Sequence, residues 1–446
     1  MKRTSAIILL CAILSAAAVI SCEEVGVEVT GPDAVVLVPS KDRIDATGLD
    51  TISFTVFSGE LDVTAEARIF SSPSNSELIS KSFSATSPGD YEFYATYKGA
   101  FSDTVSITAS GNLALAYDKA VIAADGTDMV TFTVTQDGQD VTDESTLYLL
   151  PKDGDPVAVD GNTFSTSEAG GYDFYATKGT SSSDVVSVMA TPEETPSSWS
   201  FRDRSLILEI TATWCGPCSM MKAGIKSLEQ DGWDEGYVVE AHDNDALTVN
   251  SFFNQLINFV VGAPSFRIPL VTFNFTDSPR ITSSLGSVAA NADGISSATD
   301  EANEAYPCTA GANAAFYPDG EEGLKVSSTV AISEAGEYKV CCWLLENNIK
   351  MSQTSQSEAQ QWDINNHINV LRAVSDISEI PGQAVTAGAN ETQAFEWNFS
   401  VSDLRNGRPQ DSHVLVIISK KEADGTYIVN NVVRCEYKSA VEYEYE

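Results

Sequence analysis

An internal repeat in residues 25–192 restricts the fold of this chain more than any other feature of its sequence. The segment at 50–56 (Asp-Thr-Ile-Ser-Phe-Thr-Val) is echoed at 128–134 (Asp-Met-Val-Thr-Phe-Thr-Val), and the segment at 91–96 is echoed at 172–177. In both copies apolar and polar residues alternate, which is typical of strands with one buried face. The repeat therefore predicts two similar β-sandwiches, at 25–110 and 111–191, and neither contains a cysteine.

Each copy of the repeat ends in a run of the type Gly-x-Tyr-x-Phe-x-Ala, which Gly89 and Tyr91 begin in the first copy. This run resembles the final strands of bacterial immunoglobulin-like domains, in which a tyrosine ties the corner of the sandwich to upstream backbone. Two roles stay open for such a pair: a spacer, or a ligand-binding or adhesive module. The acidic run at 153–155 lacks a full set of calcium ligands and is interpreted as an exposed turn.

The N-terminus reads as an export signal at 1–21, because Lys2 and Arg3 precede an apolar run that is too short to span a membrane. The residues before Cys22 resemble the lipobox of bacterial lipoproteins, which implies that Cys22 is lipidated after cleavage. Ordinary secretory cleavage near Cys22 is the alternative. Glu23 and Glu24 resemble retention or surface-export signals, which implies an outer membrane lipoprotein facing the periplasm or the cell surface.

The net charge of the whole chain, -37, argues against nucleic acid as a partner.

After a linker at 192–200, the pattern changes at residue 201 from β to α/β. The run at 206–212 predicts a strand buried on both faces. Helices are predicted at 220–228, 246–260 and 284–305, and further strands at 237–241 and 270–275. The alternation predicts an α/β domain at 201–306 with partly parallel strands. A C-terminal β-sandwich-like domain is predicted at 307–446, from strands at 325–332, 338–345, 395–401, 414–419 and 427–437 and a short helix near 358–374.

The motif Cys215-Gly216-Pro217-Cys218 lies where the buried strand ends and the next helix begins. A cysteine at a helix start is stabilised as the reactive thiolate, and Cys218, one turn further on, can resolve a mixed disulfide. Pro217 suits the first helical turn. Together with Trp214, Glu209 and Pro269, the motif resembles thioredoxin. That resemblance implies Cys215 as nucleophile, Cys218 as resolving thiol, Glu209 as proton relay and Pro269 as a cis-proline beside the substrate groove.

Several features bear on this interpretation. Thioredoxin has aspartate where this chain has Glu209, which makes the relay role less secure. A permanent disulfide without turnover is the alternative to a redox site. Zinc is not expected, because no second Cys-x-x-Cys and no matching histidine pair is evident. The histidines are scattered and are interpreted as surface or core residues. Cys341 and Cys342 should face opposite sides of a strand, so either pairing with Cys308 or Cys435 or buried free thiols stay open.

The combination of a lipoprotein signal, a thioredoxin-like domain and a β domain resembles the outer membrane protein 28-related lipoproteins, with residues 365–372 similar to a segment of that family. We therefore expect a multidomain, lipid-anchored thiol–disulfide oxidoreductase of the cell envelope, with no cofactor. Its partners would be disulfide-containing exported proteins, an envelope redox donor, and the membrane through the N-terminal lipid. The alternative is a surface binding or adhesion lipoprotein whose thioredoxin-like domain is a scaffold with a static disulfide.

Overall fold

The computed structural model describes residues 34–446 except residues 47, 112, 137, 179, 180, 263, 264 and 321. The predicted signal at 1–21 and Cys22 lie outside the described residues. The chain divides into two compact units, at 1–112 and 113–446. None of the helices in the described part is long and apolar enough to cross a membrane.

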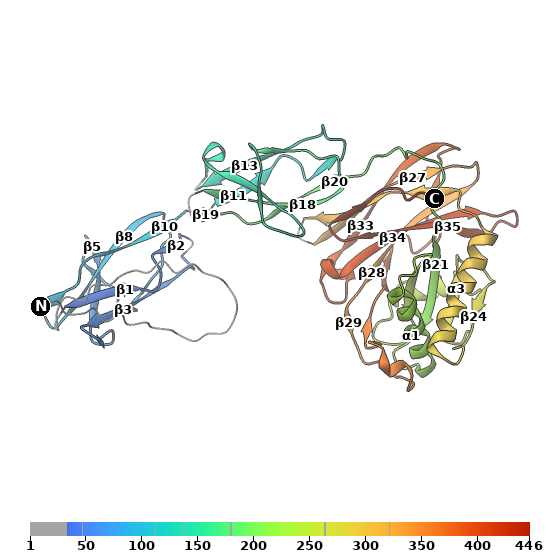
Figure 1. Cartoon of the computed structure of the whole chain (residues 1–446), viewed down its shortest axis with the longest axis horizontal. Helices are drawn as coiled ribbons and strands as arrows, with labels where there is room; N and C mark the ends of the chain where they lie inside the picture. Colours follow the sequence, from blue (N-terminus) through green and yellow to red (C-terminus); the bar gives the residue numbers. More distant parts are fainter. Residues whose placement is uncertain are drawn as a thin grey trace, which may run out of the picture. The chain divides into compact units, whose positions relative to one another are not determined.

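The first unit is a β-sandwich, drawn in blue in Figure 1. One sheet has the order β1 (Val35–Pro39), β3 (Ile52–Ser58) and β4 (Leu61–Asp62), with β7 (Ser82–Phe83) beside β3. The other has the order β2 (Arg43–Asp45), β10 (Val105–Ser110), β8 (Gly89–Tyr97), β5 (Arg68–Ser72) and β6 (Ser76–Glu77), with β9 (Ala100–Phe101) beside β8. The inward residues of both sheets, among them Phe54, Ile69, Phe93 and Ile107, form its core.

The second sandwich repeats this topology strand for strand. One sheet has the order β11 (Leu113–Tyr117), β13 (Val130–Gln136) and β14 (Gln139–Asp140), with β17 (Thr163–Phe164) beside β13. The other has the order β12 (Val121–Ala123), β20 (Val186–Thr191), β18 (Gly170–Lys178), β15 (Thr146–Leu150) and β16 (Val157–Ala158), with β19 (Ser181–Ser182) beside β18. A 3-10 turn, η1 (Thr142–Glu144), precedes β15. The prediction of a tandem of β-sandwiches is therefore confirmed.

A tyrosine hydroxyl closes the same corner in each sandwich. The hydroxyl of Tyr91 donates to the carbonyl of Ser87 at 2.8 Å, and that of Tyr172 donates to the carbonyl of Glu168 at 2.8 Å. Each tyrosine therefore bonds to backbone four residues upstream, as the resemblance to immunoglobulin-like domains implied.

The remaining chain is organised by one nine-stranded sheet. Its order is β24 (Arg280–Ile281), β23 (Leu270–Phe273), β21 (Ser205–Thr211), β22 (Gly236–His242), β31 (Val370–Val374), β28 (Tyr338–Glu346), β34 (Ser412–Lys421) and β35 (Tyr427–Glu436), with β32 (Gln383–Val385) beside β28. Strands β21 and β22 are parallel and fully in register, and β22 joins β31 in parallel at Glu240 and Val370. The sheet thus runs from the α/β region directly into the C-terminal strands.

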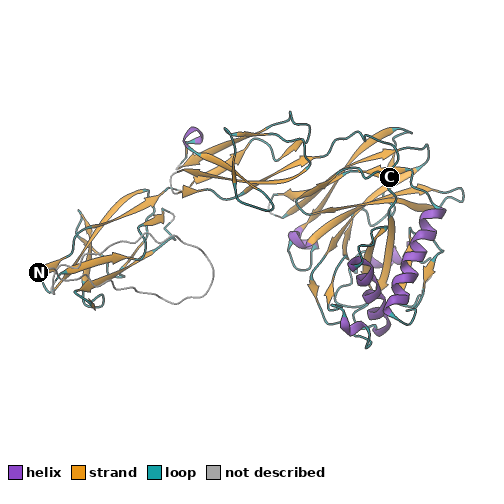
Figure 2. Ribbon diagram, in the orientation of Figure 1, coloured by secondary structure: helices purple, strands orange, loops and turns teal. Residues whose placement is uncertain are grey.

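The two faces of this sheet are covered differently. Helices α1 (Gly216–Gln230) and α3 (Val288–Ala305) pack on one face of β21–β23, and α2 (Phe253–Val260) packs on the other. Figure 1 and Figure 2 show α1 and α3 beside this sheet. The face of β28 and β34 away from α2 packs on a five-stranded sheet of β25 (Ala310–Ala312), β27 (Gly323–Ile332), β26 (Ala314–Asp319) and β36 (Ser439–Val441), with β33 (Glu391–Ser400) beside β27. A two-stranded sheet pairs β29 (Ile349–Lys350) with β30 (Asn366–His367), and the remaining 3-10 turns are η2 (Ala359–Gln361), η3 (Val401–Asp403) and η4 (Pro409–Asp411).

The expectation of a separate α/β thioredoxin-like domain at 201–306 is wrong. The described residues contain three α-helices, and the molecule is mostly β. The apolar core on the α2 face is shared, because Leu208 and Leu256 from the α/β region lie in one cluster with Trp343, Leu415 and Val429 from the C-terminal region. The sandwich expected in the C-terminal region is present, but one of its two sheets is continuous with β21 and β22.

Two predicted helices differ from the structure for local reasons. The helix predicted at 246–260 begins only at Phe253, because the Asp245 carboxylate accepts hydrogen bonds from Leu247 N and Thr248 Oγ1 and thereby holds a turn. The helix predicted near 358–374 is a 3-10 turn followed by β30 and β31. Pairing of β31 with β28 and the positive φ of Asn369 override the helical pattern.

Candidate functional site around the buried disulfide

Cys215 and Cys218 form a disulfide between the end of β21 and the first turn of α1. Cys215 is the N-cap residue, and its Sγ accepts a hydrogen bond from the backbone N–H of Cys218 at 3.2 Å. Pro217 occupies the first turn, where its missing N–H leaves no helical hydrogen bond unmade. The pair is nearly buried, with Cys215 5% and Cys218 1% exposed.

The structure places two other sequence-predicted residues, Pro269 and Trp214, beside this disulfide. The peptide bond between Ile268 and Pro269 is cis, and the Ile268 carbonyl oxygen lies 3.8 Å from Cys215 Sγ. Trp214 is 52% exposed, and its indole N–H donates to the carbonyl of Asn244 at 3.2 Å. The indole ring of Trp214 is thus an exposed apolar surface next to the disulfide.

A segment from the C-terminal region covers one side of the disulfide loop. We call residues 353–356 the strap. The Gln353 side-chain amide donates to the carbonyls of Ala212 at 3.1 Å and Cys215 at 3.0 Å. The Thr354 backbone N–H donates to the carbonyl of Thr213 at 2.7 Å. The strap was not predicted from the sequence. Its polar residues form no local pattern that would show that they lie over a loop more than a hundred positions earlier in the chain.

Glu209 lies on β21, on the face that α1 covers, and is fully buried. Both of its carboxyl oxygens lack a hydrogen-bond partner among the described residues. Burial and, to a smaller extent, the nearby Glu240 carboxylate raise the pKa of Glu209 to about 8. Near neutral pH this side chain therefore holds its proton and can release it when the local charge changes.

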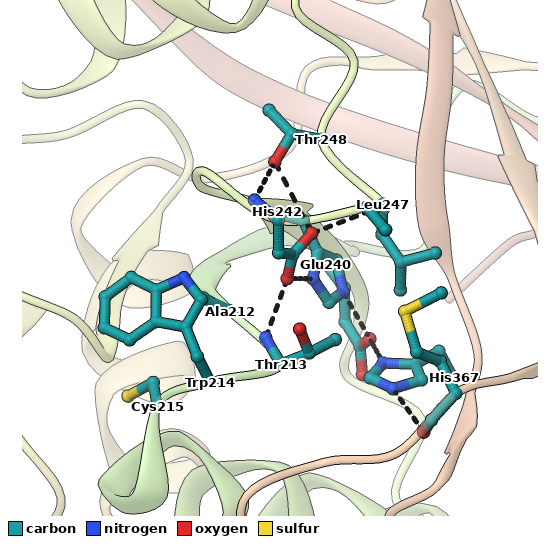
Figure 3. Close-up of polar contacts among 12 residues, drawn as sticks. Ala212, Thr213, Trp214, Cys215, Glu240, His242, Leu247, Thr248 and His367 are labelled. Carbon is teal, nitrogen blue, oxygen red and sulfur yellow. Dashed lines mark hydrogen bonds and ion pairs between the residues drawn. The ribbon is translucent and has the colours of Figure 1, made fainter.

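Four more polar side chains lie buried on the same face and form, with Glu209, the buried polar cluster. The additional members are Lys222 on α1, Glu240 and His242 on β22, and His367 on β30. Register explains part of the arrangement, since Glu209 is paired with Glu240 and Thr211 with His242 across β21 and β22. Figure 3 shows the rings of His242 and His367 close to the Glu240 carboxylate.

Charges in the buried polar cluster are compensated by close contacts. The Lys222 ammonium lies 2.7 Å and 2.8 Å from the two oxygens of Glu240, and 2.8 Å from Nδ1 of His367. Burial would raise the pKa of Glu240, but Lys222 and the two histidines outweigh burial and hold that pKa well below its usual value. Burial lowers the pKa of His367. The carboxylate of Glu240 is therefore ionised and paired.

Asp245 connects this cluster to the disulfide loop. Its Oδ2 lies 2.8 Å from Nδ1 of His242 and accepts the backbone N–H of Thr213 at 2.7 Å. Burial opposes ionisation of Asp245, but the bond and charge of His242 and backbone hydrogen bonds hold its pKa well below the usual value. Burial would lower the pKa of His242, but hydrogen bonds with Asp245 and Glu240 raise it instead.

The interpretation of the histidines as scattered is corrected by this arrangement. The ring centroids of His242 and His367 lie 5.2 Å apart, although 125 positions separate them in the chain. His413, in contrast, is buried on β34, where its Nδ1 lies 3.3 Å from the Asn347 side chain. The sequence spacing of His242 and His367 did not predict this contact, because long-range strand pairing brings the two residues together.

The four other described cysteines are unpaired. Cys341 and Cys342 lie in the cores on opposite faces of β28, as predicted. Burial raises the pKa of Cys308 and of Cys435 to about 12, and it also raises the pKa values of Cys341 and Cys342. These thiols are therefore protonated and unreactive at neutral pH.

No family model and no curated protein matches this chain. HBP35 of Porphyromonas gingivalis is 16% identical, with 54% of this chain and 77% of that chain covered and a TM-score of 0.42. Protein AGR_C_4864 from Agrobacterium tumefaciens is 13% identical, with 52% and 93% covered and a TM-score of 0.34. A C-terminal fragment of intimin is 14% identical, with 44% and 71% covered and a TM-score of 0.24.

The expected membership in the outer membrane protein 28-related lipoproteins, with a thioredoxin-like domain, is wrong. No family model supports it. The described residues form mostly β-structure, and the predicted α/β region shares its main sheet and a core with the C-terminal strands.

Proposed function

We propose that the C-terminal region exchanges disulfides with other proteins of the cell envelope through Cys215 and Cys218. One observation carries this proposal: Cys215 caps the N-terminus of α1, and its Sγ accepts the N–H of Cys218. After reduction, the same N–H and the helix dipole would stabilise a Cys215 thiolate, which is the form that attacks disulfides.

Every sulfur–sulfur bond that forms or breaks in the exchange involves only this chain and the exported protein. The Cys215 thiolate attacks one sulfur of a disulfide in an exported protein, and the other sulfur leaves as a thiolate. Cys218 then loses its proton and attacks Cys215 Sγ, which restores the Cys215–Cys218 disulfide and releases the exported protein as a dithiol. Glu209 is proposed to relay the proton of Cys218, releasing its own proton before it accepts that of Cys218, while Trp214 and Pro269 would contact the bound polypeptide. An envelope dithiol donor would reduce the pair again, and lipid on Cys22 would hold the protein at the outer membrane.

The reduction potential of the Cys215–Cys218 pair tests this proposal in the full chain. We expect a value between about -270 and -120 mV, the range of exchange proteins. Cys218→Ser should accumulate mixed disulfides with exported proteins, whereas Cys341→Ser, which changes a buried thiol, should not. A potential below about -300 mV, together with no trapped partner, would contradict exchange.

A second candidate function is binding at the cell surface, with the disulfide as a static clasp. Its specific support is an aromatic pair that occurs at equivalent cross-strand positions in both sandwiches. Phe70 stacks on Tyr94 at 5.5 Å, and Tyr148 stacks on Tyr175 at 5.2 Å. Phe101, 68% exposed, extends the first pair, and exposed aromatic surface of this kind marks interaction sites.

Adherence of the purified full chain to epithelial cell monolayers tests the second candidate. Tyr94→Ala combined with Phe101→Ala should lower adherence at least about tenfold, the effect expected from losing two contact residues. Ile79→Ser is the control, because it removes an apolar side chain that is 88% exposed and is not one of the stacked aromatic residues Phe70, Tyr94 and Phe101. Equal adherence of all three proteins would contradict binding through this surface.

A further inference from the structure

Three members of the buried polar cluster present ligand atoms to a common point. Oε2 of Glu240 lies 3.5 Å from Nε2 of His242 and 3.4 Å from Nδ1 of His367. One ligand atom from each of the three residues lies within 4.8 Å of the other two, and all three side chains are buried. Ligand atoms of a tetrahedral zinc ion with bonds of about 2.0–2.1 Å are separated by about 3.3–3.4 Å, so two of the separations already match a metal-binding geometry.

The far nitrogen of each histidine ring has an acceptor that orients the ring. Nδ1 of His242 lies 2.8 Å from the Asp245 carboxylate, and Nε2 of His367 lies 3.3 Å from the backbone carbonyl of Met351. A carboxylate and a carbonyl accept hydrogen bonds, so each ring places a proton on its far nitrogen. The near nitrogen of His367 accepts a hydrogen bond from Lys222, and the near nitrogen of His242, which bonds to Glu240, would give up its proton when a metal ion binds. Metal-binding histidines are held by this type of partner.

The Lys222 ammonium is the cation that contacts these groups in the structure. It lies 2.8 Å from Nδ1 of His367 and within 2.8 Å of both Glu240 oxygens. The site is thus built for positive charge, and an incoming ion would compete with Lys222 for the same carboxylate and the same imidazole lone pair. A donor set of two imidazoles and one carboxylate suits zinc and related transition metals and is unlike the all-oxygen sites of calcium and magnesium.

We propose that Glu240, His242 and His367 bind a divalent transition-metal ion, Zn²⁺ foremost, in competition with the Lys222 ammonium. Asp245 and the Met351 carbonyl orient the two imidazoles. The inference is independent of disulfide exchange and of surface binding, because metal binding is measured directly with the disulfide oxidised.

Calorimetric titration of the untagged, chelator-treated full chain with Zn²⁺ tests the proposal, and Co²⁺ absorption reports the coordination geometry. We expect one tetrahedral site. His242→Gln and His367→Gln should each weaken binding at least about tenfold, while His413→Gln, which changes a buried histidine outside the cluster, should leave it unchanged. Lys222→Met should strengthen binding about tenfold or more, equivalent to about 1.4 kcal/mol, because it removes the competing cation.

Two results would overturn the site. One is a wild-type chain that binds no Zn²⁺ and a Lys222→Met chain that binds none either, which would make the cluster an ion network closed by Lys222. The other is a sulfur ligand in the X-ray absorption spectrum of the Zn²⁺-loaded wild-type chain, which would place the ion on cysteines. The spectrum needs no variant, so the test holds even where a substitution prevents folding.

Discussion

Asp203 precedes β21 and is partly buried beside the backbone of Cys308. Burial, reinforced by the charges of Glu235 and Glu446, raises the pKa of Asp203 to about 6, although hydrogen bonds from the Cys308 and Arg204 backbone oppose the shift. Because the folded pKa exceeds the unfolded value, the native state binds the proton more tightly. The resulting stability is complete below about pH 4 and is lost as the pH rises through about 6.

We therefore expect Asp203→Asn to flatten this part of the stability profile. The wild-type chain should lose about 1–2 kcal/mol of unfolding free energy between about pH 4 and 6 from this group, a value that allows for its partial exposure. Urea unfolding of both chains across this interval measures the difference. Parallel profiles for wild type and variant would show that Asp203 titrates normally.

The tyrosine hydroxyl at the corner of each sandwich should add a measurable amount to the unfolding free energy of that sandwich. Tyr91→Phe removes only the hydroxyl that donates to Ser87, so we expect a loss of about 0.5–1.5 kcal/mol. Hydrogen exchange should report faster opening of β8 and β10 and no change in the second sandwich. Tyr172→Phe is the reciprocal control and should affect β18 and β20 alone. Faster exchange in both sandwiches from one substitution would contradict this local role.

Single residues differ in how far their setting could be predicted from sequence. Cys215, Pro217 and Cys218 were placed correctly, because a buried strand followed by a cysteine and a proline determines where a helix begins. Lys222, Glu240, His242 and His367 gave no such signal. Lys222, Glu240 and His242 lie in or at the end of apolar stretches, and His367 lies among asparagines. Only the register of β21 with β22 and the return of the chain at β30 bring them together.

Among elements, the strap gives the sharpest prediction. The Gln353 amide satisfies two carbonyl groups of the disulfide loop, and Gln353→Ala leaves both without this donor. We expect a loss of about 1–3 kcal/mol in stability and faster reduction of the Cys215–Cys218 disulfide by dithiothreitol, because the strap then opens more often.

Gln356→Ala is the matched control for this experiment. Gln356 bonds to Ser219 Oγ through its backbone N–H, and its side chain is exposed, so the substitution removes no strap contact. Its reduction rate should equal that of the wild-type chain. Equal rates in the Gln353→Ala chain as well would show that the strap does not control access to the disulfide.

The elements that sequence patterns misplaced are those whose structure depends on distant partners. Strand β31 lies in a segment with a helical pattern, yet it pairs with β28 along its edge and with β22 at Val370. Strands β27, β28, β34 and β35 were predicted close to their observed bounds, since each is a long run with strand composition, whereas β33 begins before its predicted start at 395. Local pattern therefore located long strands well and a short, centrally paired strand poorly.

At the scale of the whole molecule, the repeat sufficed to predict the tandem sandwiches, because each copy buries its own core. The C-terminal region had no comparable signal. A change from an α/β pattern to a β pattern suggested two domains at 201–306 and 307–446, but the pattern does not show whether the two sets of strands join one sheet. Whether the strands join one sheet depends on the contact of β22 with β31, in which a single pair of residues, Glu240 and Val370, is in register.

Truncation should reveal this dependence. Residues 201–306 expressed alone would expose the unpaired edge of β22 and part of the apolar sheet face on which α2 packs. That face includes Leu206, Leu208 and Ile210, which pack in one cluster with Trp343 and Leu415 in the intact chain. We expect this fragment to aggregate or to melt without a cooperative transition, because it lacks the C-terminal part of the core on the α2 face and leaves a sheet edge unpaired.

Residues 201–446 should in contrast melt cooperatively, since this fragment retains both sheets and all three helices. Circular dichroism and thermal unfolding of the two fragments, side by side, measure the difference. A cooperative transition in 201–306 alone would mean that the α/β region supplies its own sufficient core. The continuous sheet would then be a docked interface between two domains, and the disulfide site could be studied apart from the strap.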